Sequence, residues 1–213
     1  MSRWPILLVL APGLLGCSQE PATATDQIAS GVVVSEIEPA IERATSAATD
    51  FSGRLRSALQ ERMQSDGPVA AVDFCHAQAP RIADAVMAEH GVRLGRVAVP
   101  GRNRNPANVP ADWQRQALAG FQSQVDAGAA AGEQLFVQQE NLPPGVALRM
   151  MRGIAVEPVC LACHGEAIPA PVAQAIAGHY PDDAATGFET GDLRGGLWVQ
   201  VPASDQPDRE ILP

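Results

Sequence analysis

The feature that most constrains this chain is the pentapeptide Cys160-Leu161-Ala162-Cys163-His164. Two thiols separated by two residues can form thioether bonds to the two vinyl groups of one porphyrin, and the histidine that follows then lies beneath the iron. The motif therefore predicts one covalently attached haem c, with His164 as an axial ligand of the iron. The rest of the chain is then expected to enclose a haem that is attached at these positions.

Four other interpretations compete with haem attachment: a redox-active Cys-x-x-Cys, half of a zinc site, a disulfide and chance. A zinc site needs a second pair of ligands, which is not evident in the sequence. A thioredoxin-like site is expected in a βαβ context, which the pattern around Cys160 lacks. Together with the export signal described next, these points favour haem.

The first residues have the features of an export signal. Arg3 precedes a short apolar run that ends at Leu14-Leu15-Gly16-Cys17. A charged start and a small residue before the cleavage point are typical of a signal peptide, and the run is too short to span a membrane as a helix. The ending resembles the lipobox of bacterial lipoproteins, which implies that residues 1–16 are removed and that Cys17 carries the lipid. An ordinary signal peptide cut nearby is the alternative. We expect an extracytoplasmic, periplasmic protein that a lipid anchors to a membrane.

Composition and charge exclude several classes of function. The chain has 213 residues and its 15 basic residues are all arginine, which excludes a Schiff-base lysine, a P-loop lysine and a lysine general base. The net charge is −9, and removal of Arg3 with residues 1–16 changes it to −10. This charge argues against nucleic acid and against adhesion to an anionic membrane surface, because both need a basic face. No paired base and nucleophile and no second metal site is evident, so we expect no enzymatic activity.

The hydrophobic periodicity indicates one domain that follows a tether. Residues 17–34 are small and polar, which is typical of a flexible linker, and the acidic residues 203–213 are expected to be a frayed tail. Residues 35–202 form the predicted domain. Its predicted elements are helices at 35–66 and 68–90, a strand at 92–99, a helix at 111–127, strands at 134–139 and 146–156, a helix from the haem motif to Gly178, and a strand at 197–201. Long helices followed by short antiparallel-type strands predict an α+β fold with one sheet.

The second predicted helix carries Cys75, the cysteine left over after the lipid and the haem have taken the other three. The apolar positions place Cys75 on the buried side, with His76 about 100° further round the helix. Pro80 removes a hydrogen bond from this helix, and we expect a kink there. Candidates for the second axial ligand are Cys75, His76, His90, His179, Met63, Met87, Met150 and Met151. The residues alone favour Cys75 ahead of His76, while a lone buried cysteine that acts only as a small hydrophobic residue is the alternative.

Two arginines in the loop after the first predicted strand are candidates for binding the haem propionates. Arg102 and Arg104 lie in a turn-rich segment, and a guanidinium fork matches the geometry of a carboxylate. Exposed loop arginines without a ligand are the alternative.

Four short motifs occur in order along the chain. They are Cys75-His76-Ala77-Gln78-Ala79-Pro80; Arg104-Asn105-Pro106-Ala107-Asn108-Val109-Pro110 with Trp113; Cys160 to Gly165; and Tyr180 to Gly187 with Gly191 to Gly195. Over roughly residues 35 to 201, these motifs resemble those of the PAS-like c-type haem sensor domains, a family long catalogued as one of unknown function. The resemblance implies a PAS-like antiparallel sheet flanked by helices, with two long N-terminal helices.

The resemblance also implies a ligand set. It implies that Cys160 and Cys163 bind haem c, that His164 takes one axial position, and that the cysteine of the family's helix, here Cys75, takes the other. In the family, the segment that leads into this loop is expected to contain serine, whereas this chain has Arg102 there. Many relatives continue into signalling modules, so a sensor that ends at Pro213 is expected to act through a protein partner.

These observations predict an exported monohaem c protein that senses redox state or a small gas, such as NO or CO, through a His/Cys-ligated haem. A thiolate ligand favours ferric iron, and its release on reduction or protonation frees a position for a diatomic gas. The competing hypothesis is an electron-transfer cytochrome c lipoprotein with no sensing role, and a binding module with a structural haem is a third. The expected partners are haem, a redox or signalling protein, and a membrane reached only through the lipid.

Overall fold

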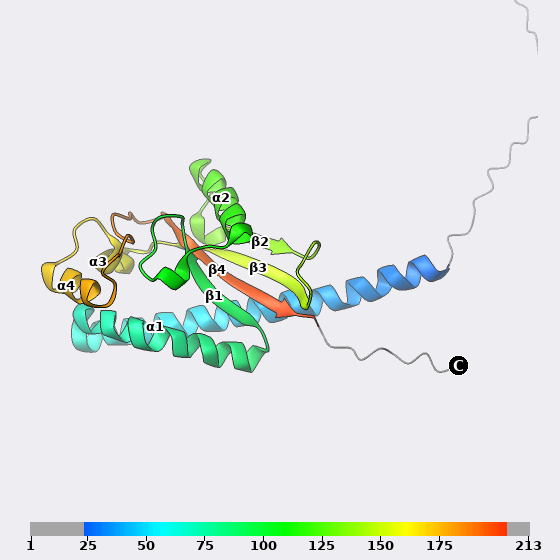
Figure 1. Ribbon diagram of the computed structural model, residues 1–213, viewed down its shortest axis with the longest axis horizontal. Coiled ribbons are helices and arrows are strands. Elements are labelled where there is room, and N and C mark those ends of the chain that lie inside the picture. Colours follow the sequence, from blue (N-terminus) through cyan, green and yellow to red (C-terminus); the bar gives the residue numbers. More distant parts are fainter. Residues whose placement is uncertain (1–23, 204–213) are drawn as a thin grey trace, which may run out of the picture. The chain divides into compact units, whose positions relative to one another are not determined.

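A computed structural model describes the backbone of residues 24–203 and the side chains of residues 37–203 (Figure 1). The predicted signal peptide, the predicted lipidation site Cys17, residues 17–23 of the predicted tether and residues 204–213 of the predicted tail lie outside this part of the chain. Among the described helices, none combines the length and the hydropathy that crossing a membrane requires.

The chain divides into two units, residues 1–34 and 35–213. Of the first unit, residues 24–34 are described and are helical, whereas the sequence pattern predicted a flexible linker there. The description that follows concerns the second unit, which contains the sheet and the predicted haem motif.

Each predicted helix and strand has a counterpart in the described structure. In chain order the elements are α1 (Ala24–His90), β1 (Arg93–Ala98), α2 (Asp112–Asp126), β2 (Leu135–Gln138), β3 (Val146–Ala155), α3 (Leu161–His164), α4 (Ala170–His179) and β4 (Leu193–Pro202). Short 3₁₀ turns occupy Pro106–Asn108, Ala131–Glu133 and Pro158–Cys160.

Helix α1 consists of two arms that meet at Gly67. The φ of 79° and ψ of 178° at Gly67 lie outside the helical region, in a conformation that glycine adopts without the steric cost of a Cβ. The two arms lie side by side in Figure 1, and Arg54 on the first arm pairs with Glu89 on the second at 2.5 Å. The second arm ends before Gly91, whose φ of 61° is the left-handed conformation typical of the glycine that follows a helix. The two long N-terminal helices are therefore present as the arms of one element.

The four strands form one antiparallel sheet in the order β1-β4-β3-β2. Strand β4 is central and pairs with β1 and β3, so that Trp198 lies opposite Gly95 on one side and Met151 on the other. A single antiparallel sheet with flanking helices confirms the predicted α+β class and its PAS-like arrangement.

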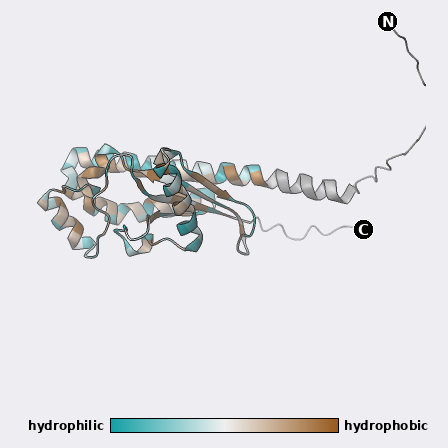
Figure 2. Ribbon diagram, turned by 90° about the horizontal axis from the view of Figure 1, so that it is seen from above, coloured by the Kyte–Doolittle hydropathy of each residue, from teal (hydrophilic) through white to brown (hydrophobic). Residues whose placement is uncertain are grey.

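Helices cover both faces of the sheet. Successive strand residues point to opposite faces, so neighbouring residues of one strand pack in different cores. Met150 packs in the core on the α1 side, whereas Met151 packs in the core on the α2 side. The core toward α1 contains Ala40, Ala44, Ala47, Ala48, Phe51, Val86, Leu94, Leu148, Leu197, Val199 and Val201. The core toward α2 contains Val97, Ala117, Leu118, Phe121 and Leu193. The small alanines of the first arm let the helix approach the largely hydrophobic strands closely (Figure 2).

One expectation about the helices needs correction. The helix predicted to run from the haem motif to Gly178 is divided, because Gly165 is extended with φ −74° and ψ −175° and α4 begins only after Pro169. A proline disfavours helical angles in the residue before it, so the segment ahead of Pro169 cannot continue α3. Pro80 lies inside the second arm of α1, and the kink expected there stays a prediction.

Candidate haem-binding site

The predicted haem motif lies at the end of the sheet. Strand β3 leads through the Pro158–Cys160 turn directly into α3, which places both thiols and the imidazole of the motif on one and a half turns of backbone. Cys160 packs against Ala185 and Phe188, whereas Cys163 packs with α4 and with Val72 of α1. Both are free thiols and are partly buried. The two sulfurs are thus presented by one short segment that other parts of the chain enclose.

The ring of His164 is fixed by a hydrogen bond from Nδ1 to the carbonyl oxygen of Ala185, at 2.8 Å. Because the carbonyl can only accept, Nδ1 carries the proton and Nε2 keeps a free lone pair. Burial, with the positive charges of Arg194 and Arg104, lowers the pKa of His164 to about 3. The imidazole is therefore neutral at physiological pH and has one nitrogen available for a metal.

The segment that fixes His164 is itself bound to the end of α3. The amide of Phe188 donates to the carbonyl of His164 at 2.9 Å, and the amide of Gly187 donates to the carbonyl of Gly165 at 3.0 Å. The ring of Phe188 lies edge-on to the imidazole, with centroids 6.4 Å apart. The break at Gly165 exposes these carbonyls, which a continuous helix would have used internally.

Arg104 connects the haem motif to the segment that carries Asp183 and Ala185. Its guanidinium donates to the carbonyl of Cys163 at 2.6 Å and to the carboxylate of Asp183 at 3.0 Å. The other oxygen of Asp183 accepts the amide of Ala185 at 2.9 Å. Arg104 and Asp183 have side chains only 13% and 10% exposed, so their pairing is largely shielded from water. The pair therefore binds the backbone of Cys163, which precedes His164, and the backbone of Ala185, which accepts the hydrogen bond from His164.

Two further arginines lie over Phe188. Arg102 stacks on its ring at 3.4 Å and donates to the carbonyl of Thr186 at 2.5 Å, while Arg194 lies 5.0 Å from the same ring. Burial, together with the neighbouring charges of Arg104 and Arg96, lowers the pKa of Arg194 to about 10. The guanidinium of Arg102 is thus engaged with this segment, and its binding of a propionate stays a prediction.

The charges and polar atoms of the site fit a haem. Four arginines bring positive charge to the site, namely Arg96, Arg102, Arg104 and Arg194. Within residues 37–203, only Asp183 forms an ion pair with any of them. Nε of Arg104 is buried without a hydrogen-bond partner, which is costly unless a ligand supplies an acceptor. An anionic group with acceptor oxygens satisfies both features, and the two propionates of haem are such acceptors.

Cys75 lies near this site, on the second arm of α1. Burial raises the pKa of its thiol, the positive charges of Arg96 and Arg104 act in the opposite direction, and Cys163 adds to the rise. These influences place Cys75 within electrostatic range of the haem motif. Val72, one helical turn earlier, packs with Cys163 in the same hydrophobic cluster. The structure therefore brings the predicted second ligand toward the motif, across 85 residues of sequence.

The other candidate ligands lie elsewhere or are engaged. His90 bonds to Asp50 at 3.1 Å, and His179 bonds to Asp73 at 2.7 Å. His76 is exposed and bonds to the hydroxyl of Tyr180 at 3.0 Å. The sulfur-containing candidates Met87, Met150 and Met151 pack in the cores on the two faces of the sheet, and Met63 lies on the first arm of α1.

Sequence reasoning gave no role to four residues of the site, namely Asp183, Ala185, Phe188 and Arg194. They belong to the last of the four motifs or directly follow it, but their types do not reveal their contacts. A carbonyl that accepts from His164 leaves no signature in the sequence. The concentration of arginine in a chain without lysine was the one available hint, because a guanidinium suits buried ion pairs.

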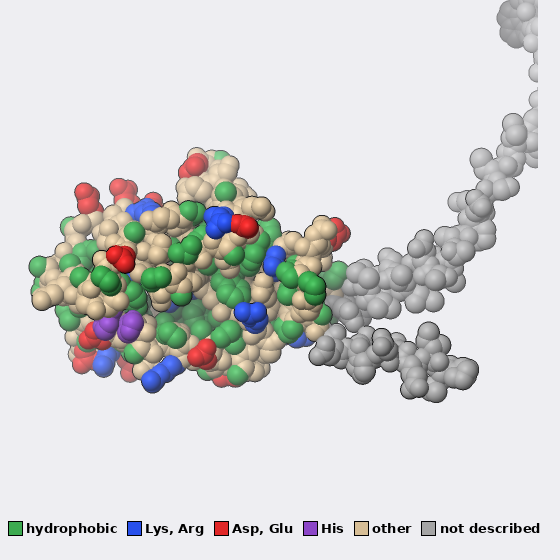
Figure 3. Space-filling view, viewed as in Figure 1, with side chains coloured by type: hydrophobic (Ala, Val, Ile, Leu, Met, Phe, Trp, Pro, Cys, Tyr) green, Lys and Arg blue, Asp and Glu red, His purple; other side chains and the backbone are tan. Residues whose placement is uncertain are grey.

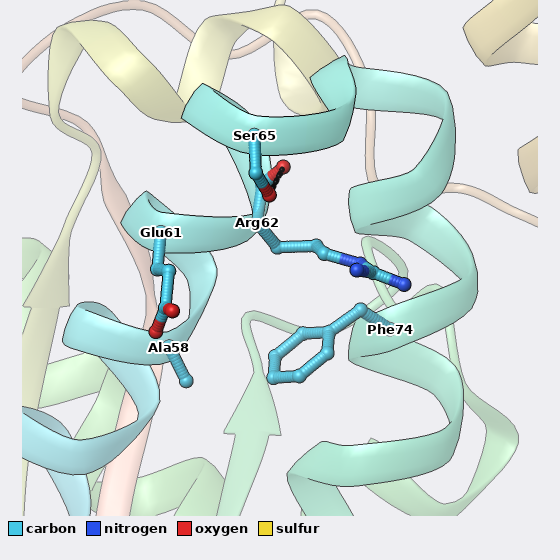
Figure 4. A pocket seen from close by; sticks show the side chains of 5 residues that line it. All are labelled: Ala58, Glu61, Arg62, Ser65 and Phe74. Atoms are coloured by element: carbon cyan, nitrogen blue, oxygen red, sulfur yellow. Dashed lines mark hydrogen bonds between the residues drawn. The ribbon is translucent and has the colours of Figure 1, made fainter.

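A surface hollow of about 210 Å³ lies away from these residues, between the two arms of α1 (Figure 4). It is lined by Ala58, Glu61, Arg62, Ser65 and Phe74. Phe74 precedes Cys75, but neighbouring side chains on a helix project about 100° apart. None of the predicted haem residues lines this hollow.

Replacing Arg104 tests its connecting role. We expect Arg104→Gln to lower the free energy of unfolding by about 2–3 kcal/mol, because it leaves the buried carboxylate of Asp183 unpaired. Urea unfolding at pH 7 measures this. Arg62→Gln is the matched control, since Arg62 pairs with Asp66 at 2.6 Å on the exposed face of α1 and should contribute less than about 0.5 kcal/mol. Equal losses in the two variants would contradict the role of Arg104.

The chain is similar to known proteins over most of its length. A family model described as Tll0287-like matches residues 24–202, which span every described helix and strand. The crystal structure of the cyanobacterial haem protein Tll0287 is similar to this one with a TM-score of 0.52 and 26% sequence identity, and the match covers 85% of this chain and 97% of that chain. No curated protein matches the sequence. Because the family model covers most of the chain, the protein belongs to the Tll0287-like family.

Proposed function

We propose that this protein is an exported, lipid-anchored monohaem c protein that senses redox state or a small gas. Cys160 and Cys163 hold the haem through thioether bonds, His164 and Cys75 are its axial ligands, and Cys17 carries the lipid. The haem supplies an iron that takes up one electron and binds diatomic gases. The chain belongs to the Tll0287-like family, and its structure is similar to that of the haem protein Tll0287. Both points support haem binding.

One observation carries the proposal: His164, at the end of a Cys-x-x-Cys-His segment, is held by Ala185 so that its Nε2 is free. Metal-binding histidines usually donate their other ring nitrogen to a carbonyl or carboxylate, which fixes both the tautomer and the orientation of the ring. Zinc, a competing explanation of the thiols, needs four ligands. Within the described residues, the groups able to hold a metal through three or more side chains do not include this motif.

Arg104 is the residue we assign to a propionate, because its buried Nε has no partner within the protein. Arg194 and Arg96 add positive charge on the same side, and burial lowers the pKa of each. Arg102, stacked on Phe188, instead holds the segment that orients His164. An anionic group bound among these arginines relieves their mutual repulsion.

Cys75 is the second axial ligand in this proposal, and its surroundings support a switch. Burial favours the neutral thiol, so the thiolate depends on stabilisation by Arg96, Arg104 and a bound cation. Cys75 with this dependence would be held less firmly by a less positive iron, so it would be the ligand released on reduction, and a diatomic gas would then be able to take its place. We propose a sensor of this kind rather than an enzyme.

Covalent attachment is tested on the denatured protein. We expect the chain, produced with a haem-attachment system, to keep one haem after unfolding, because thioether bonds do not depend on the fold. Intact-mass measurement and haem staining of a denaturing gel detect it. The double variant Cys160→Ala/Cys163→Ala should lose the haem, whereas Cys75→Ala should keep it. Loss of all haem from the unmodified protein on denaturation would remove the c-type assignment.

Replacement of Cys75 tests the second ligand. We expect Cys75→Ser to change the ferric visible spectrum and to raise the midpoint potential by on the order of 0.1 V, a part of the ~0.8 V range that axial ligands span. Spectroelectrochemistry measures both quantities. His76→Gln is the control for the neighbouring candidate and should leave the spectrum unchanged. An unaltered spectrum and potential in Cys75→Ser would show that the thiol is not a ligand.

Gas binding separates sensing from plain electron transfer. The ferrous protein is expected to bind CO or NO, because reduction weakens the bond to Cys75. Titration of the Soret band with CO, beside a five-coordinate haem protein as reference, measures this. An electron-transfer cytochrome keeps both ligands, so failure to bind either gas at concentrations that saturate the reference would favour that alternative.

A further inference from the structure

The turn of α1 that carries Cys75 is held by the end of α4. Four side chains make the contacts: Asp73 and His76 lie on either side of Cys75 in the sequence, and His179 and Tyr180 come from the end of α4. Both histidines are exposed, and Figure 3 shows histidine side chains gathered in one patch of the surface. None of these four side chains belongs to the proposed ligand set of the haem.

Tyr180 joins this turn to the surroundings of the haem motif. Its hydroxyl forms a hydrogen bond with Nδ1 of His76 at 3.0 Å, and the two rings meet edge to face with their centroids 5.4 Å apart. The ring of Tyr180 also packs against the hydrophobic cluster to which Val72 of α1 and Cys163 of the haem motif belong. Val72 lies about one helical turn before Cys75. One side chain therefore contacts both the helix of the proposed second ligand and the cluster beside the haem motif.

The backbone of Tyr180 is fixed as well. Its amide donates to the carbonyl of Ile176 at 2.8 Å, and its carbonyl accepts from the amide of Asp183 at 3.1 Å. Asp183 pairs with Arg104, whose guanidinium binds the carbonyl of Cys163. Tyr180 is thus a firm support for the turn that it contacts, because moving it would disturb the buried ion pair.

The hydroxyl of Tyr180 keeps its proton at neutral pH. Burial raises its pKa and Cys75 adds to the rise, whereas the positive charges of Arg104 and Arg96 act in the opposite direction. These influences place the side chain within electrostatic range of Cys75. The hydroxyl can therefore both donate and accept a hydrogen bond at this position.

A second contact between the same elements is more exposed. Nε2 of His179 bonds to the carboxylate of Asp73 at 2.7 Å, and the rings of His179 and His76 stack with their centroids 4.3 Å apart. The side chain of Asp73 is 65% exposed, so its bond to His179 contributes little. The partly buried Tyr180 is the main support of this turn.

We propose that Tyr180 is a positioning residue for the second axial ligand, because its hydrogen bond to His76 restrains the turn that carries Cys75. This inference rests on the proposed ligation of the haem by Cys75. With the bond in place, Cys75 leaves the iron less readily. Without it, the turn moves more freely and another ligand competes better with the thiolate.

Competition by imidazole on the ferric, haem-loaded full chain tests the proposal. Added imidazole binds the iron only where Cys75 has left it, so its apparent affinity reports how firmly Cys75 is held. We expect Tyr180→Phe to raise this affinity about fivefold, as expected for the loss of one ordinary hydrogen bond. The midpoint potential should rise by about 40 mV, which is the same factor converted at about 59 mV per tenfold for one electron. The ferric spectrum should not change, because the ligand is the same.

Matched variants show whether the hydrogen bond itself is responsible. His76→Ala removes the bond from the other side, so the double variant Tyr180→Phe/His76→Ala should shift the potential no further than His76→Ala alone. Asp73→Ala should change the imidazole affinity less than about twofold, because its contact is exposed. His90→Gln loses a hydrogen bond to Asp50 at the end of the second arm of α1 and should match the unmodified protein.

Cys75→Ser separates a failure of this inference from a failure of the proposed function. An imidazole affinity that Cys75→Ser leaves unchanged would remove the ligation by Cys75, and the inference with it. If Cys75→Ser binds imidazole more tightly while Tyr180→Phe and His76→Ala match the unmodified protein, the ligation stands and the positioning role is overturned. A lower free energy of unfolding in urea without a change in potential would also overturn it, since packing alone explains that result. His76→Ala provides the test if Tyr180→Phe does not fold.

Discussion

The arrangement around His164 depends on one buried ion pair, Arg104 with Asp183. Besides each other, the two side chains bind backbone groups: Arg104 binds the carbonyl of Cys163, and Asp183 binds the amide of Ala185. Cys163 directly precedes His164, and Ala185 accepts the proton of its Nδ1. The pair therefore fixes the histidine from both sides. Loss of either charge leaves its partner buried and uncompensated, which costs more than the contact itself contributes.

The distribution of charge is the second organising feature. The chain is acidic as a whole, with a net charge of −9, yet four arginines act on the region that holds the predicted haem motif. Such a concentration is unfavourable by itself, and it adds to the effect of burial, which is the main cause that lowers the pKa of Arg194 to about 10. It becomes favourable when an anionic group enters, so the protein has an electrostatic reason to hold a dianionic ligand. The charges of Arg96 and Arg104 also act on the thiol of Cys75, the proposed second ligand.

Much of the fold could be predicted, because regular elements have local signatures. The alternation of Met150 and Met151 between two cores, the stretch of small residues on α1 and the glycine cap at Gly91 all follow from periodicity and backbone sterics. The break at Gly165 was missed because the apolar spacing of α3 and α4 is compatible with one helix. A hydrogen bond to a carbonyl from another segment, as at His164, carries no residue-type signal, and the roles of Phe188 and Arg194 were hidden for the same reason.

The sequence by itself determined the motif chemistry, the α+β class and the buried side of the helix that carries Cys75. These follow from spacing along the chain, since two thiols and an imidazole within five residues need no distant partner to be recognised. Only the tertiary structure decided which residues meet: Arg104 with Asp183 across 79 positions, His76 with Tyr180 across 104, and His164 with Ala185 across 21. Periodicity identifies the face of an element that is buried, but the packing of the elements selects the group that this face contacts.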